Sequence, residues 1–412
     1  MNLMMLVTAL AAQTVDPTGS NPTTQTGTQG ASTGSSSYVD LEAGGGYSSN
    51  PILSLDTDNG AAFGRLAVHA VHTRVSARTT TVLSAYGQSL FYTRRYGTQE
   101  SVDVEARHDA LVNEHLRVFG DLSAIYDKGG QLDTRIIGVP NVPPPPGSTL
   151  PPALLPGGSD FFSVTGREYR FSGNLGAQAS LSARDSLDLT AGVDHVVFKT
   201  GGIDTRYTTT PVSIGYNRQL SQQSTIGLRV VAEHTDYNGP NSFRVITPEA
   251  TFTANLSERL TFSGAAGVSF ASVDNGVTTS HSTGLSANAK LCSTGLRGQA
   301  CVYGSVDQQA ATVAGPTRNI SGGVDYSRRL TADDTIDLSA AINHYSNPTS
   351  LIAKSFSHAT YIRAAADYSR RISDRWFAGV DLAARKVTQS GPDPDADLSA
   401  SLFIRYRFGD VR

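Results

Sequence analysis

The sequence predicts an all-β fold: a transmembrane antiparallel β-barrel of about 18 strands, preceded by a signal peptide and a flexible linker. Three observations predict this class. Apolar and polar residues alternate along most of the chain, the alternating segments run for roughly 13 to 15 residues, and one turn motif recurs at regular intervals. Together they indicate long strands joined in successive hairpins.

The alternation is clearest in the last segment, DLSASLFIRYRF, where apolar side chains occupy every second position from Leu398 to Phe408. A soluble sandwich alternates in the same way, so the pattern alone does not select a membrane protein. Strand length favours a membrane protein, because strands of soluble proteins usually have about five or six residues. The strands predicted here are long enough to cross a bilayer obliquely. The apolar faces are mostly Ala, Val, Leu and Gly with aromatics near the ends, as expected of a lipid-facing band.

The turn motif appears as VDYSRRLTADD from Val324 and ADYSRRISDRW from Ala366, with looser copies from Ile214 and Thr251. The order of residues predicts strand, short turn and strand. We expect a Leu or Ile to open the strand after each turn; these residues are Leu181, Leu220, Leu256, Leu291, Leu330 and Ile372. Each interval fits two strands, one turn and one longer loop, which places all short turns and both ends of the strand series, near Tyr38 and Phe408, at one rim.

The predicted boundaries are residues 1–13 for the signal peptide, 14–37 for the disordered linker, 38–408 for the barrel and 409–412 for a C-terminal tail. The first segment has an apolar run ending in Ala9-Leu10-Ala11 but no basic n-region, so a disordered N-terminus is the alternative. The linker is rich in Thr, Ser and Gly.

A proline-rich loop runs from Asp127 to Val164, and its composition forbids ladder pairing over much of its length. A loop of this length in a compact protein is usually functional or disordered. Two placements remain open: the loop folds into the lumen and narrows it, or it caps the barrel from outside.

The composition gives little support to other functions. The formal net charge of −3 offers no electrostatic argument for nucleic acid, so none is expected as a partner. The nine histidines form no HExxH motif, and the chain has no GxSxG, P-loop or dinucleotide fingerprint. We therefore predict no catalytic residues, no metal site and no cofactor, and expect that the protein is not an enzyme.

The period-2 alternation, in which every second residue of a strand faces inward, places charged residues of both signs on the inward face. We call this odd or even position in the alternation the parity of a residue. The residues predicted to line the pore are Asp103, Glu105, Arg107, Asp121, Arg170, Arg229, Glu233, Asp325, Arg363, Asp367, Asp381, Arg385, Arg405 and Arg407. They fit a watery pore with mild cation preference or none, and they also fit ion-paired filling that stiffens the wall. An eighteen-stranded circumference is too wide for side chains to fill, which favours a channel unless the proline-rich loop plugs it.

Cys292 and Cys301 are the only cysteines, and alternation gives both the inward parity on two strands of one hairpin. Equal-facing residues near a short turn come within about 5 Å, a separation compatible with a disulfide. We predict this bond at the short-turn rim, with two free thiols as the alternative.

The last strand resembles the signal by which the barrel assembly machinery recognises outer-membrane proteins, carried here by Leu402, Ile404, Tyr406 and Phe408. In most such proteins the aromatic residue is the last, whereas four residues follow here. The aromatic-Ser-Arg-Arg-Leu-Ser/Thr turn is similar to that of outer-membrane barrel porins of proteobacteria, including those associated with exopolysaccharide and exosortase loci. The resemblance implies an outer-membrane location.

These observations predict a non-catalytic pore for hydrophilic solutes or for export of a polysaccharide. The alternative is a structural or surface-display barrel plugged by its proline-rich loop. The expected partners are outer-membrane lipid, the barrel assembly machinery, and a polysaccharide or proteins of an export complex. Nothing in the sequence selects the solute or the oligomeric state.

Overall fold

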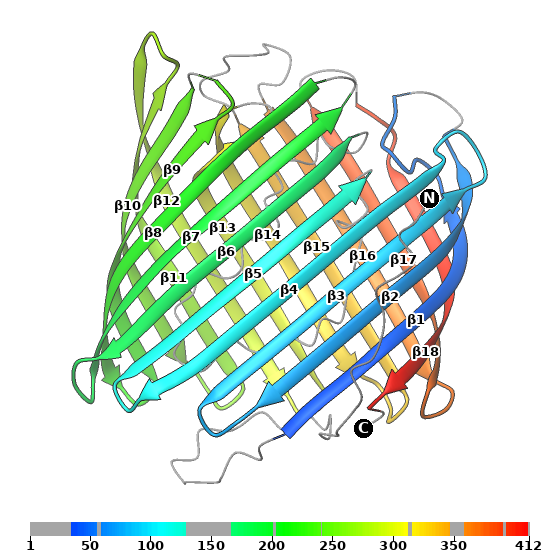
Figure 1. Ribbon diagram of the computed structural model, residues 1–412, viewed down its shortest axis with the longest axis horizontal. Helices are drawn as coiled ribbons and strands as arrows, with labels where there is room; N and C mark the ends of the chain where they lie inside the picture. The colour runs from blue at the N-terminus through cyan, green and yellow to red at the C-terminus, as the bar shows by residue number, and fades with distance from the viewer. Residues whose placement is uncertain are drawn as a thin grey trace.

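The computed structural model describes residues 34–55, 59–128, 166–200, 203–239, 241–311, 315–346, 358–389 and 393–410. They form eighteen antiparallel strands in one closed barrel (Figure 1). The strands are Gly34–Ser48 (β1), Ala61–Val75 (β2), Thr79–Tyr92 (β3), Thr98–Asn113 (β4), Leu116–Lys128 (β5), Arg167–Ser180 (β6), Asp185–Thr200 (β7), Ile203–Ser221 (β8), Ser224–Tyr237 (β9), Ser242–Asn255 (β10), Leu260–Asp274 (β11), Thr279–Gly295 (β12), Gly298–Ala311 (β13), Gly315–Arg329 (β14), Asp334–Ser346 (β15), His358–Arg371 (β16), Trp376–Gln389 (β17) and Asp397–Gly409 (β18). None of the described residues forms a helix long and apolar enough to span a membrane.

The barrel closes where β1 pairs with β18, from Tyr38 opposite Gly409 to Ser48 opposite Ser399. We call this pairing the seam. Each of the remaining sixteen strands pairs with the strand before it and the strand after it, so none of the eighteen described strands has an unpaired edge. The predicted fold class is thereby confirmed. β1 begins at Gly34 rather than at residue 38, and residues 1–33, which hold the predicted signal peptide and most of the linker, lie outside the described residues.

The alternation in the sequence becomes two different faces of the wall. On the outward face large apolar side chains are exposed, including Leu228 at 68% and Leu402 at 66%. On the inward face polar and charged side chains predominate, and several are nearly inaccessible, such as Asp40 at 4%. The wall therefore presents an apolar exterior around a polar interior, the arrangement of a barrel that sits in lipid.

The repeated turn motif has one backbone structure in four turns, at residues 181–184, 256–259, 330–333 and 372–375. In the first, the amide of Leu181 donates to the carbonyl of Asp185 at 2.8 Å. The hydroxyl of Ser182 accepts the amides of Arg184 and Asp185, both at 3.1 Å. Ser257 and Thr331 cap their turns in the same way. The motif therefore reflects turn chemistry, in which a Ser or Thr satisfies two amides.

This geometry corrects the expectation that the Leu or Ile opens the following strand. Because the hydroxyl residue caps amides that come after it, the apolar residue before it must begin the turn; Leu181 directly follows β6. Leu291 was misassigned altogether, since it lies inside β12 and the turn comes at residues 296–297. The short turns still lie at one rim, along the lower edge of Figure 1, with the starts of β1 and the end of β18.

Candidate functional site: the inner wall and the mouth of the barrel

The register places all fourteen predicted pore-lining residues on the inward face. Directly opposed residues share a face, and such pairs include Arg363 with Arg385 and Asp367 with Asp381. The neighbouring residues in each strand belong to the opposite, apolar face, as Leu382 at 50% exposure illustrates. That these side chains meet a passing solute remains a prediction.

Many charges on the inward face are held in ion pairs between neighbouring strands. These pairs include Arg170 with Asp194 at 3.0 Å, Arg229 with Glu249 at 2.6 Å, Arg117 with Asp109 at 2.7 Å, Arg405 with Glu42 at 3.1 Å and Arg407 with Asp40 at 2.7 Å. The last two cross the seam, so they reinforce its backbone ladder. The ion-paired wall that the sequence offered as one alternative is present in this surface, and a watery pore with mild cation preference or none remains a prediction.

The connection that follows β1 turns back toward the barrel at the long-loop rim. Leu53 is buried against Tyr345, Ala359, Tyr361 and Val387, which are inward residues of β15, β16 and β17. We call residues 49–55 the mouth loop. The sequence marks it only as one of several long connections, whereas the structure folds it onto the inner wall through an apolar contact.

A buried ion pair anchors the mouth loop to the wall. The Nη2 of Arg385 donates to Asp397 Oδ2 at 2.8 Å and to the carbonyl of Pro51 at 2.9 Å. The other carboxylate oxygen of Asp397 accepts the Ser48 hydroxyl at 2.6 Å and the Asn50 amide at 3.0 Å. The two charged side chains are only 3% and 2% exposed. Arg385 has the predicted parity, but it anchors the loop and does not line open lumen.

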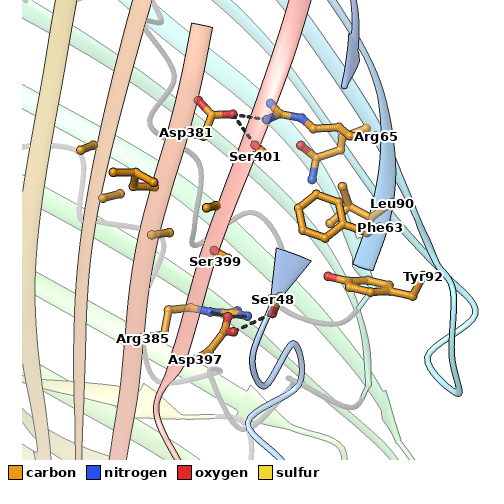
Figure 2. A pocket seen from close by; sticks show the side chains of 16 residues that line it. Ser48, Phe63, Arg65, Leu90, Tyr92, Asp381, Arg385, Asp397, Ser399 and Ser401 are labelled. Atoms are coloured by element: carbon orange, nitrogen blue, oxygen red, sulfur yellow. Dashed lines mark hydrogen bonds and ion pairs between the residues drawn. The ribbon is translucent and has the colours of Figure 1, made fainter. Parts of the chain in front are cut away.

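Beside this pair the inner wall holds a recess of about 80 Å³ (Figure 2). Its floor is made of the small residues Ala365, Ala383, Ser399 and Ser401 from β16, β17 and β18. Ala365, Ala383 and Ser399 are aligned in the register between two rows of polar inward residues, Arg363 with Arg385 and Asp397 on one side and Asp367 with Asp381 and Ser401 on the other. The residues that line the recess come from β1, β2 and β3 and from β16, β17 and β18, two groups of strands that are far apart in sequence.

Charged pairs close the two ends of the recess. At one end lies the Arg385 and Asp397 pair; at the other, Arg65 Nη1 donates to Asp381, and the Ser401 hydroxyl donates to the same carboxylate at 3.2 Å. The second guanidinium nitrogen of Arg65 lies 2.9 Å from Glu42. Figure 2 shows the two pairs facing each other across the floor.

Two glycines allow Arg65 to make this contact. Arg65 belongs to β2 and Asp381 to β17, with β1 and β18 between them. On β1 the inward positions opposite Arg65 and Phe63 are Gly44 and Gly46, so no side chain blocks the guanidinium. A Cβ on either glycine would also collide with a carbonyl oxygen of β18. Glycine is therefore needed for the close approach of the strands at the seam.

The third side of the recess is apolar. Phe63, Leu90 and Tyr92 come from β2 and β3 and line it opposite the floor. The rings of Phe63 and Tyr92 have centroids 5.6 Å apart with an interplanar angle of 55°. The recess thus combines an aromatic side, two charged ends and a polar floor.

Cys292 and Cys301 stand directly opposite each other on β12 and β13 and form a disulfide. Both are buried and have the inward parity that the sequence indicated. The bond lies close to the short turn at residues 296–297, at the end of a hairpin far from the recess. It cross-links two strands that are already joined by backbone hydrogen bonds.

The four residues of the predicted assembly signal lie on the outward face of β18. Tyr406 packs edge-on against Trp376, with ring centroids 4.8 Å apart, and against Phe408 at 4.6 Å. These rings form an aromatic group near the short-turn rim, where interfacial girdles are expected. Leu402 and Ile404 continue the same face toward the middle of the strand. Recognition of this face by assembly machinery remains a prediction.

Within the described part of the chain, no group of three or more His, Cys, Asp and Glu side chains is placed to hold a metal ion. The polar groups of the recess belong to two ion pairs of arginine with aspartate, to serines, to Gln88 and to the hydroxyl of Tyr92. They can donate and accept hydrogen bonds.

No protein-family model matches the chain, and no curated protein matches it. Solved structures with a similar shape include the ferric-catecholate import receptor Fiu from E. coli K12, at 8% identity and a TM-score of 0.46, covering 91% of this chain and 82% of that one. The FrpB iron transporter from Neisseria meningitidis matches at 8% identity and 0.44, covering 90% and 82%. OccK2 (OpdF) from Pseudomonas aeruginosa, in complex with glucuronate, matches at 7% and 0.43, covering 91% and 98%.

Sequence reasoning missed the mouth loop and the recess. Parity assigned Arg385 and Asp381 to the interior, but it could not show that one is covered and the other is open. The run Gly44-Gly45-Gly46 within a strand was the available signal, since glycine in a strand often marks close approach of another backbone or a ligand.

Proposed function

We propose that this protein is a non-catalytic outer-membrane pore that passes small hydrophilic solutes. The observation that carries the proposal is the division of one closed wall into an apolar exterior and a charged interior. A charged side chain on the lipid face costs about 2–4 kcal/mol at mid-membrane, so this division suits a barrel in lipid. With eighteen strands the circumference exceeds what inward side chains can fill, which supports a water-filled lumen.

Planar-bilayer recording tests the pore directly. Purified, folded barrel should produce steady open steps whose size scales with salt concentration. The control is the same protein after heat denaturation, which should give none. Silence from a preparation that remains heat-modifiable on gels would reject the pore and favour the structural or surface-display alternative.

The proline-rich loop offers a second measurement on the pore. From residue 129 onward this loop lies outside the described residues. Deleting Pro140 to Pro156 should raise conductance if the loop narrows the lumen, and it should leave conductance unchanged if the loop lies outside. Passage of a polysaccharide strand rests on the turn-motif resemblance alone, and we do not include it in the proposal.

Assembly by the outer-membrane machinery is part of this proposal, and the outward aromatic group on β18 supports it. Replacing Tyr406 or Phe408 with Ala should lower the yield of heat-modifiable barrel in outer-membrane fractions while export continues, because it removes the alternating terminal signal. The matched control is Leu382→Ala, an outward apolar residue on β17. Equal yields for all three variants would show that this face carries no assembly signal.

A further inference from the structure

Two polar groups in the recess have no hydrogen-bond partner among the described residues. The hydroxyl of Ser399 is one, although the neighbouring Ser48 and Ser401 both donate to carboxylates. The other is the amide nitrogen of Gln88, whose oxygen accepts the Tyr86 hydroxyl at 2.6 Å. Half-buried polar groups are normally paired with protein or with water, so both are available to a ligand in the recess.

The charges at the ends of the recess favour a neutral ligand. Each arginine already faces an aspartate, so a free anion or cation would have to displace a charged partner that is fixed in place. Hydroxyl groups can both donate and accept, and they can bind to such pairs without separating them. The ends therefore suit an alcohol better than a carboxylate, a phosphate or an amine.

The remaining side suits a ring or chain with an exposed carbon face. Phe63, Leu90 and Tyr92 offer apolar surface opposite Ser399. A water molecule needs roughly 10–15 Å³ of such volume, so about 80 Å³ admits several waters or one edge of a ring, with the rest of the solute in the lumen. A pyranose has hydroxyls on its edge and C–H groups on its face.

We propose that the recess is a binding subsite for a neutral polyhydroxylated solute, a monosaccharide or one residue of a saccharide. Ser399 and Gln88 bind its hydroxyls, the partly exposed pair of Arg65 and Asp381 orients it, and Phe63 with Tyr92 covers its carbon face. This inference rests on the proposed function, because it places the subsite on the path of a solute through the pore.

Single-channel recording with added solute tests the subsite. D-glucose in the millimolar range should reduce the mean current of the wild type in a saturable way. A polyethylene glycol of equal hydrodynamic size is the steric control and should give no saturable reduction. Sodium glucuronate should act no more strongly than glucose. Equal effects of glucose and the polyether would overturn the subsite while leaving the pore intact.

Substitutions in the floor locate the binding. Ser399→Leu fills the recess and should abolish the response to glucose, whereas Ser263→Leu, an exposed inward serine on β11, should leave it unchanged. Ser399→Ala removes one hydrogen bond and should weaken the response about two- to tenfold. A full response in Ser399→Leu protein that is heat-modifiable would reject the proposal.

Calorimetry keeps the two proposals separate. Titration of glucose into detergent-folded barrel measures binding whether or not current flows. Heat of binding that is lost in Ser399→Leu and retained in Ser263→Leu supports saccharide binding in the recess even if the bilayer is silent, in which case the pore, and with it the position of the recess on a solute path, is wrong. Open steps without heat or saturable block would leave the pore and reject the subsite.

Discussion

The two ends of the recess carry the same chemistry in different surroundings. Arg385 and Asp397 are 3% and 2% exposed beneath the mouth loop, whereas Arg65 and Asp381 are 17% and 30% exposed at the other end. Both are arginine and aspartate pairs on the inner wall. The first joins the adjacent strands β17 and β18, and the second joins β2 and β17 across β1 and β18. The alternation along a barrel strand shows only that a charged side chain points inward. Whether that side chain is exposed to the lumen depends on the loop that lies over it.

Burial changes what each pair contributes. A covered pair has lost its hydration, so removing one partner leaves a charge that water cannot reach. The second pair is only partly covered, and Arg65 has Glu42 as a second carboxylate partner, so removing Asp381 leaves no isolated buried charge. We expect the first pair to matter for folding of the loop and the second for the solutes and ions in the pore.

The largest effect should come from Asp397→Asn. The amide can still bond Ser48, but it leaves Arg385 buried without its counter-charge, and the free energy of unfolding should fall by about 3–5 kcal/mol. Urea unfolding of the barrel in detergent measures the loss. Replacing both partners by Leu should recover most of it, since the isolated charge is then gone. A loss below about 1 kcal/mol in Asp397→Asn would contradict the comparison.

The disulfide provides an independent scale for this effect. Replacing Cys292 and Cys301 together by Ser opens only a short loop whose strands are already paired, so the cost should stay below about 3 kcal/mol. The same urea titration, with wild type in reducing buffer as the control, measures it. A cost greater than that of Asp397→Asn would mean that the far hairpin depends on its cross-link more than the mouth depends on its ion pair.

The smallest effect on stability should come from Asp381→Asn. Because this carboxylate is partly open to the lumen, the change in unfolding free energy should be within about 1 kcal/mol. Its effect should appear in ion selectivity, because Arg65 then faces one carboxylate, that of Glu42, in place of two. A reversal potential measured in a salt gradient should shift toward anions, and Asp397→Asn barrels should not show this shift. An unchanged potential would place Asp381 off the ion path.

The sequence was sufficient for the fold and insufficient for the site, for a physical reason. Alternation and strand length depend on local pattern, and these predicted eighteen strands with the correct inward parity. The contact of Arg65 with Asp381 joins residues 316 apart in sequence and depends on two glycines in a third strand. The burial of Arg385 depends on Leu53 folding back onto three distant strands. Neither contact leaves a periodic signal.

The first and last strands of the barrel are joined at the short-turn rim in a way that bears on topology. The amide of Ser37 donates to the Asp410 carboxylate at 2.7 Å, and the amide of Asp410 donates to the Ser37 carbonyl at 2.9 Å. The barrel therefore closes without a covalent link between its ends, in a place where a short peptide could bridge them. A circular permutant joined there and opened at the turn of residues 256–259 should keep all eighteen ladders, because the wall has no intrinsic first strand.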